Sequence, residues 1–189
     1  EGQPPLFEAQ RVFVRYRLHA LLAGRLEFPE IVMDTPQANW VRQPDGRTNL
    51  DPLREARAIQ EETKPARRAP RPFHIGALTV TNGTLRLSRL AADGGSQVSE
   101  INALALGLEN VGNDQQGRVK ISAGLSHTAT AGTGLTNGQG RLQGTLTGDF
   151  TARLDRRLRP SLARGEARLQ VAKADGTLAD LQEVVGTLG

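Results

Sequence analysis

Apolar and polar side chains alternate along residues 141–154. One side of this stretch is apolar or glycine and comprises Leu142, Gly144, Leu146, Gly148, Phe150, Ala152 and Leu154. The other side carries only Arg, Gln, Thr and Asp. A period of two is typical of a strand with one buried face. At about 3.3 Å per residue the stretch spans roughly 46 Å, which is long for a strand.

Four further stretches show the same period of two. They are residues 11–18, 98–108, 118–125 and 165–172, and glycine-containing turns separate several of them. Long amphipathic strands make a sheet whose apolar face must be covered by helices or by curling of the sheet itself. The sequence therefore predicts a mainly β fold, a long, curled antiparallel amphipathic sheet with one or two short helices, in a single module over residues 1–189.

An internal repeat relates residues 31–40 to residues 78–87 at an offset of 47 positions. In the second copy Asn82-Gly83 is a strong signal for a two-residue hairpin turn. In the first copy Pro36 cannot adopt the positive φ of such a turn, so a wider turn is expected there. The predicted hairpins pair Val80 with Leu85, Leu78 with Leu87, Met33 with Ala38 and Ile31 with Trp40.

Two helical segments are predicted. Residues 19–23 form one turn at most, and Gly24 suits its C-terminal cap. A longer helix over about residues 51–62 has a narrow apolar stripe. Residues 63–72 follow it with three prolines and four basic residues, a composition typical of an extended, solvated linker.

The composition argues against several kinds of chemistry. The chain has no Cys, so disulfides, metal-thiolate sites and redox motifs are excluded. His19, His74 and His127 are far apart in sequence, and none has a His or carboxylate at metal-ligand spacing. The glycine-rich residues 132–140 lack the lysine and the following helix of a phosphate-binding loop. We therefore expect no metal, no cofactor and no enzymatic activity.

The chain is basic, with a formal net charge of +4. Such a balance is typical of a solvated charged face or of a surface that binds anions. Most of the basic residues are arginines spread along the strands beside Glu, Asp, Thr and Gln, which favours the solvated face. The basic residues 63–72 contain no aromatic side chain that could stack on bases, so no nucleic acid partner is expected.

The order of the elements in residues 11–90 resembles the opening of AsmA-like proteins. The matching passage consists of a strand, an x-Pro step, a second strand and an Asp-Gly-x-x-Asn segment. The residues that mark it are Leu22, Gly24, Arg25, Ile31, Pro36, Trp40, Gly46 and Asn49. A second set in the next copy comprises Ile75, Leu78, Asn82, Gly83, Leu85 and Leu87. Residues 165–181 also resemble, more loosely, a repeated passage of the same proteins.

AsmA-like proteins and their larger TamB-like relatives are anchored in the inner membrane of Gram-negative bacteria and project into the periplasm. They are linked to outer-membrane biogenesis and are understood to form long curled sheets whose apolar groove conducts lipid. The resemblance implies a truncated or isolated periplasmic module, with a membrane anchor in the parent protein before Glu1. It implies lipid acyl chains or the membrane as partners, and other envelope proteins as further partners.

The apolar positions of the predicted strands make a candidate lipid groove. Its residues are Val12, Val14, Tyr16, Ile31, Met33, Trp40, Leu78, Val80, Leu85, Leu87, Leu142, Leu146, Phe150 and Leu154. Two other functions remain open. One is an envelope assembly scaffold that contacts proteins through exposed strand edges. The other is a polysaccharide-degrading enzyme on a β-sandwich or β-helix, which would need converging carboxylates in one cleft.

Overall fold

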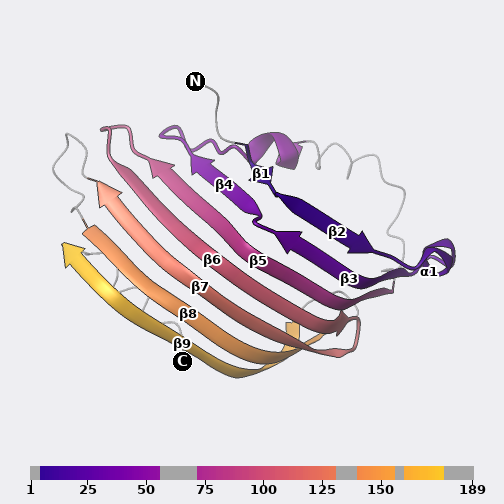
Figure 1. Ribbon diagram of the computed structural model, residues 1–189. Helices are drawn as coiled ribbons and strands as arrows, with labels where there is room; N and C mark the ends of the chain where they lie inside the picture. Colours follow the sequence, from indigo (N-terminus) through magenta and orange to yellow (C-terminus); the bar gives the residue numbers. More distant parts are fainter. Residues whose placement is uncertain (1–4, 56–71, 131–139, 156–159, 177–189) are drawn as a thin grey trace.

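The protein folds into one curved, open sheet of nine strands (Figure 1). The computed structural model describes residues 5–55, 72–130, 140–155 and 160–176, and the side chains of 160–163 are not among them. Within these ranges no second layer of strands or long helices packs on the sheet. The predicted mainly β fold with short helices is confirmed.

The elements follow one another along the chain with short connections in most places. Their bounds are β1 Phe7–Glu8, β2 Arg11–Arg15, α1 Leu18–Leu22, β3 Leu26–Asp34, β4 Gln37–Arg42, β5 Phe73–Leu90, β6 Ser96–Gly112, β7 Gln116–Thr130, β8 Gly140–Leu154 and β9 Pro160–Gly176. Residues 51–55 are also helical. The strand predicted over residues 141–154 is β8, and it pairs along its whole length with β7 and β9.

Strands β5 to β9 form an antiparallel meander, whereas β3 and β4 join β5 in parallel. β3 and β4 lie end to end along β5, and β2 and β1 pair with their outer edges. The sheet is therefore mixed rather than wholly antiparallel. Its two long sides are β9 on one edge and β1 with β2 on the other, as Figure 1 shows.

The offset of the internal repeat equals the offset between the residues that β3 and β4 pair with on β5. Ile31 lies beside Leu78 and Trp40 lies beside Leu87, so the paired residues are separated by the same 47 positions as the repeat. The two hairpins predicted from the repeat are wrong. β5 runs straight through Asn82-Gly83, and β3 passes into β4 at residues 35–36 without reversing direction.

The turn signals inside the repeat mark bulges instead. Thr35, Asn82 and Ala103 all have positive φ, at 49°, 53° and 48°, and they lie on neighbouring strands or, for Thr35, between β3 and β4. The register of β5 with β6 shifts twice between Val80 and Leu85, as expected where first β5 and then β6 carries an extra residue. Asn tolerates this left-handed conformation, so Asn82 provides one bulge residue rather than half of a hairpin turn. A row of bulges across adjacent strands bends and twists the sheet.

We expect Ala103→Gly to stabilise the fold by about 0.5–1 kcal/mol, because a left-handed residue with a Cβ is strained and glycine is not. Ala105→Gly is the matched control, since Ala105 is also exposed on the same strand but does not have positive φ. That change is expected to destabilise by about 0.5–1 kcal/mol. Urea denaturation of both variants would measure the difference, and equal effects would contradict the bulge.

The predicted helical turn at residues 19–23 is confirmed as α1, and Gly24 follows it with a φ of 75°. The helix predicted at 51–62 is helical over residues 51–55, and its remainder lies outside the described residues. So do nearly all of the predicted linker, most of the loop at 132–140, and the closing segment after residue 176.

The Asp-Gly-x-x-Asn passage returns the chain to the edge of β4. Gly46 has a φ of 85°, and the side-chain amide of Asn49 forms hydrogen bonds with the backbone of β4. Its Nδ2 donates to the Asn39 carbonyl at 2.7 Å, and its Oδ1 accepts from the Val41 N–H at 3.0 Å. The side chain thus replaces a short piece of neighbouring strand and satisfies edge groups that would otherwise need water.

Candidate functional site: the apolar face of the sheet

One face of the sheet is apolar from edge to edge. Strand register places Val14, Ile31, Leu78, Leu108, Val119 and Phe150 in one row across β2, β3, β5, β6, β7 and β8. The next row consists of Val12, Met33, Val80, Leu106, Ile121, Gly148 and Ala167. We call the surface made by these rows and their continuation toward β4 the apolar face.

Beyond the bulges the apolar face continues with Ala38, Leu85, Ile101 and Leu125 in register. The bulge in β5 shifts the alternation by one, so that even-numbered and then odd-numbered residues face the same side. Trp40, Leu87 and Leu142 follow in the row after that, with Ser99 and His127 between Leu87 and Leu142. Ser99 Oγ lies 2.8 Å from His127 Nδ1, so the two polar side chains in this row satisfy one another.

The fourteen predicted groove residues fall on this face or at its ends. Those within paired strands share the face by register: Val12, Val14, Ile31, Met33, Trp40, Leu78, Val80, Leu85, Leu87, Leu142, Leu146 and Phe150. Tyr16 follows the last residue of β2, and Leu154 ends β8. The paired residues thus share one face by register although the hairpin pairing that suggested it is wrong, and whether they form a groove that binds lipid stays a prediction.

Several residues of the apolar face were missing from the predicted groove. They are Ile101, Leu106, Leu108, Val119, Ile121, Ala123, Leu125, Leu169 and Val171, on β6, β7 and β9. The same period of two that marked residues 141–154 also marks these strands, so the signal was present. What the sequence did not supply is the register that aligns them with β5 and β8.

Nothing in the described part of the chain covers this face. Its central residues are buried by their neighbours, with Val80 5% and Ala123 4% exposed. Toward the edges the exposed fraction rises to 52% for Val12 and 54% for Leu169. Among the described residues only two others, Ala20 at 0% and Ile75 at 9% exposed, count as buried apolar side chains, and none of the large ones is completely buried. A sheet of this size with so small a core presents an apolar surface that is open to a partner.

Glycines on β8 shape the apolar face locally. The Phe150 ring lies over Gly148, where a Cβ would come within 2.5 Å of the ring. Gly148 therefore makes room for the aromatic ring, which covers the glycine and keeps the face apolar at that point. The cost of glycine in a strand is offset here by the packing of a large ring.

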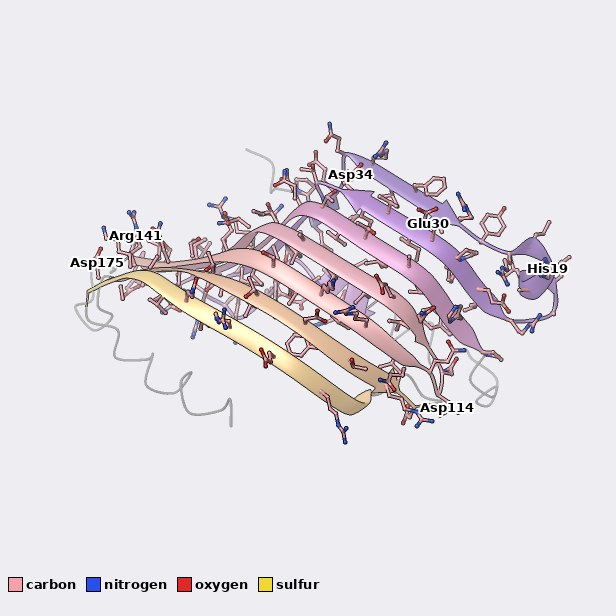
Figure 2. The ribbon with its side chains drawn as sticks, turned by 60° about the horizontal axis from the view of Figure 1, so that its bottom comes forward. His19, Glu30, Asp34, Asp114, Arg141 and Asp175 are labelled. Atoms are coloured by element: carbon pink, nitrogen blue, oxygen red, sulfur yellow. The ribbon has the colours of Figure 1, made fainter. Side chains whose placement is uncertain are left out.

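Over most of its area the opposite face is polar and is tied together by ion pairs between neighbouring strands, although register also places Phe13, Phe28 and Ile75 on it. Arg118 donates two hydrogen bonds to Asp149, at 3.0 and 2.7 Å, and Arg11 Nε donates to Asp34 at 2.7 Å. Thr81 Oγ1 also donates to Asp34 at 2.6 Å. The Thr81 hydroxyl and then Arg11 hold the pKa of Asp34 below its ordinary value, and Arg118 does the same to the pKa of Asp149. Figure 2 shows Asp34 with Glu30 on β3 and Arg141 near Asp175 at one end of the sheet.

A shallow hollow of about 600 Å³ lies on the polar face, where β5, β6, β7, β8 and β9 each contribute three consecutive residues to its lining. Its floor is made of small residues that include Thr79, Gly107 and Ser122. Asp149 and Glu166 are register neighbours in its wall and are the carboxylates that a glycoside hydrolase would need. Arg118 hydrogen-bonds to Asp149 and lowers its pKa, so Asp149 is not suited to be the general acid of such a pair.

The apolar face ends in a cationic corner at the ends of β4 and β5. Arg42 lies beside Arg89 in the parallel register, one pleat beyond Trp40 and Leu87. A hollow of about 180 Å³ opens here, and Gln97 also lines it. At the other end of the sheet α1 projects past the strands, as the position of His19 in Figure 2 shows. Its Leu22 is 81% exposed.

Comparisons with known proteins do not assign the chain to a group: no family model matches it, and no curated protein matches it either. In the described ranges no three His, Cys, Asp or Glu side chains gather as a metal site would require. None of the described helices has the length and apolarity to cross a bilayer.

Proposed function

We propose that this protein is a non-enzymatic module that binds or guides lipid acyl chains along its apolar face. The observation that supports this most directly is a continuous apolar surface across six or more strands with no covering layer among the described residues. Burial of apolar area against acyl chains is worth about 25 cal/mol per Å², so a surface of this kind gains much from such a partner. The resemblance to AsmA-like proteins supports a periplasmic setting in outer-membrane biogenesis.

The projecting helix α1 fits a membrane as a further partner. Leu18, Leu21 and Leu22 are all exposed, and Tyr16 stands next to them with a polar hydroxyl at the end of an apolar ring. Exposed leucines beside an aromatic residue are typical of surfaces that insert into the interfacial region of a bilayer. A contact at α1 would place one end of the apolar face at the membrane surface.

An envelope assembly scaffold is the second candidate function, and the edge strand β9 favours it. β9 pairs with β8 on one side only, and along Pro160–Gly176 no other described strand lies on its second side. A long edge of this kind is a template for strand addition by a partner. Leu169 and Val171 are exposed on it, so a partner strand would also extend the apolar face.

Native mass spectrometry of the protein released gently from cells tests the lipid function. We expect adducts whose masses match lipids and which disappear after extraction with an organic solvent. Protein that arrives without lipid, and that takes up none from added vesicles, would contradict the proposal. Specific crosslinks to other proteins along β9 in the same lipid-free sample would favour the scaffold.

A further inference from the structure

We infer that Arg42 and Arg89 bind the phosphate of an anionic phospholipid whose acyl chains lie along the apolar face. The inference rests on the proposed lipid function and adds to it the chemical class of the lipid and the direction in which it lies. Three features of the corner formed by β4 and β5 support it: its charge, its position and its shape.

The charge of the corner is not balanced. Arg42 and Arg89 are neighbours in the parallel register, and both are exposed on the apolar face. Neither guanidinium has an ion-pair partner in the part of the chain that the structure describes. On the polar face, by contrast, Arg11, Arg86 and Arg118 each pair with a carboxylate of the next strand.

Two like charges side by side in a sheet repel one another and destabilise the pairing of the strands. The nearest acidic residues in sequence are otherwise engaged: Asp45 pairs with Arg47, and the Asp93 carboxylate accepts the Gly95 N–H. An anion bound between the two guanidinium groups would relieve the repulsion. Arginine suits a phosphate especially well, because its planar fork donates two hydrogen bonds to adjacent oxygens.

The corner lies where the apolar face stops. Trp40 and Leu87 precede the two arginines by one pleat on the same face, and Leu85 and Ala38 precede those. A molecule that satisfies both regions must have an anionic head and an apolar tail. Trp40 is 39% exposed at this boundary, and an amphipathic indole ring is well suited to a lipid headgroup region.

The shape of the corner admits a headgroup. A hollow of about 180 Å³ is lined by Trp40, Arg42, Leu87, Ser88, Arg89, Gln97 and Ser99. A neighbouring hollow of about 160 Å³ shares Arg89 and Gln97 with it. Gln97 and Ser99 add an amide and a hydroxyl that can bond to phosphate or glycerol oxygens. Nucleic acid fits less well, since Trp40 is the one aromatic side chain in either hollow.

The test compares two lipids with identical acyl chains, phosphatidylglycerol and diacylglycerol, in detergent-free binding to the whole protein. We expect phosphatidylglycerol to bind about tenfold more tightly, the gain typical of one to two charge-assisted hydrogen bonds at a partly solvated site. In the double variant Arg42→Gln with Arg89→Gln this preference should disappear, and diacylglycerol should bind as before.

Arg86→Gln with Arg141→Gln is the matched control. Both arginines lie toward the same end of the sheet, but register places them on the polar face, so the control removes the same net charge without touching the corner. It should keep the tenfold preference. If the control loses the preference as fully as the corner variant does, general attraction explains the binding and the inference is wrong.

The remaining outcomes are also decisive. Equal binding of both lipids to the unchanged protein would overturn the phosphate site but leave the proposed function intact. Failure to bind either lipid would overturn both. Glycerol phosphate and a short oligonucleotide serve as competitors: competition by either at the affinity of phosphatidylglycerol would show that the acyl chains contribute nothing, and would overturn a lipid as the occupant.

Discussion

Replacing Val80 with aspartate is expected to destabilise the fold by about 3 kcal/mol. Val80 is 5% exposed at the centre of the apolar face, between Met33 and Leu106 in register. A carboxylate there would lose its water without finding a hydrogen-bond partner among the apolar side chains around it. A loss of this size is a large fraction of the stability of an ordinary domain. Urea denaturation monitored by far-UV circular dichroism would measure it.

Thr79→Asp provides the control for this result. Thr79 precedes Val80 on β5 but faces the polar side and is exposed, in the same row as Lys120. A carboxylate at this position stays hydrated, and we expect a change within about 0.5 kcal/mol. If the two variants unfold at the same urea concentration, Val80 does not lie among apolar neighbours and the assignment of faces is wrong.

The parts of the fold that follow from local sequence were predictable. Residues 141–154 alternate because each strand residue faces the side opposite to its neighbour, and β8 has that arrangement along its length. The single turn before Gly24 was predictable as well, because a glycine with positive φ ends a helix favourably.

The pairing of strands was not predictable by the same means. Taken alone, the dipeptide Asn82-Gly83 predicts a hairpin, because both residues can adopt the positive φ of a two-residue turn. In the structure Asn82 does have positive φ, but β5 pairs with β6 on one side and with β3 and β4, end to end, on the other, and it continues past Asn82. The competing interaction was the parallel pairing of two repeat copies that are 47 residues apart, which no local signal reveals.

The cationic corner of the candidate site was missed for a related reason. Arg42 and Arg89 are each ordinary strand-end residues in a chain with many arginines. They become a pair only through the register of β4 with β5. The offset of 47 residues does relate one to the other, two residues beyond the ends of the repeat copies, but the predicted hairpins directed this signal to the wrong partners.

Replacing Leu146 with aspartate is expected to weaken lipid binding strongly at a small cost in stability. Leu146 lies on the apolar face between Ala123 and Leu169, and it is only partly buried because nothing described covers it. The carboxylate can therefore reach water, and we expect a loss of about 1 kcal/mol. Acyl chains that lie on this face would meet a charge in apolar surroundings, which should weaken lipid binding at least about tenfold.

Thr147→Asp is the matched control for Leu146→Asp in the same two assays, which together separate a lipid surface from an ordinary core. Thr147 is the next residue of β8 and faces the polar side, so it adds the same charge on the other face and should leave both the melt and lipid binding unchanged. A fall in stability for Leu146→Asp as large as that expected at Val80 would mean that Leu146 is as deeply buried as Val80, and would refute an open groove at this position. Unchanged lipid uptake in Leu146→Asp would instead place the acyl chains on a part of the apolar face away from the middle of β8, because a charge beside them would weaken binding.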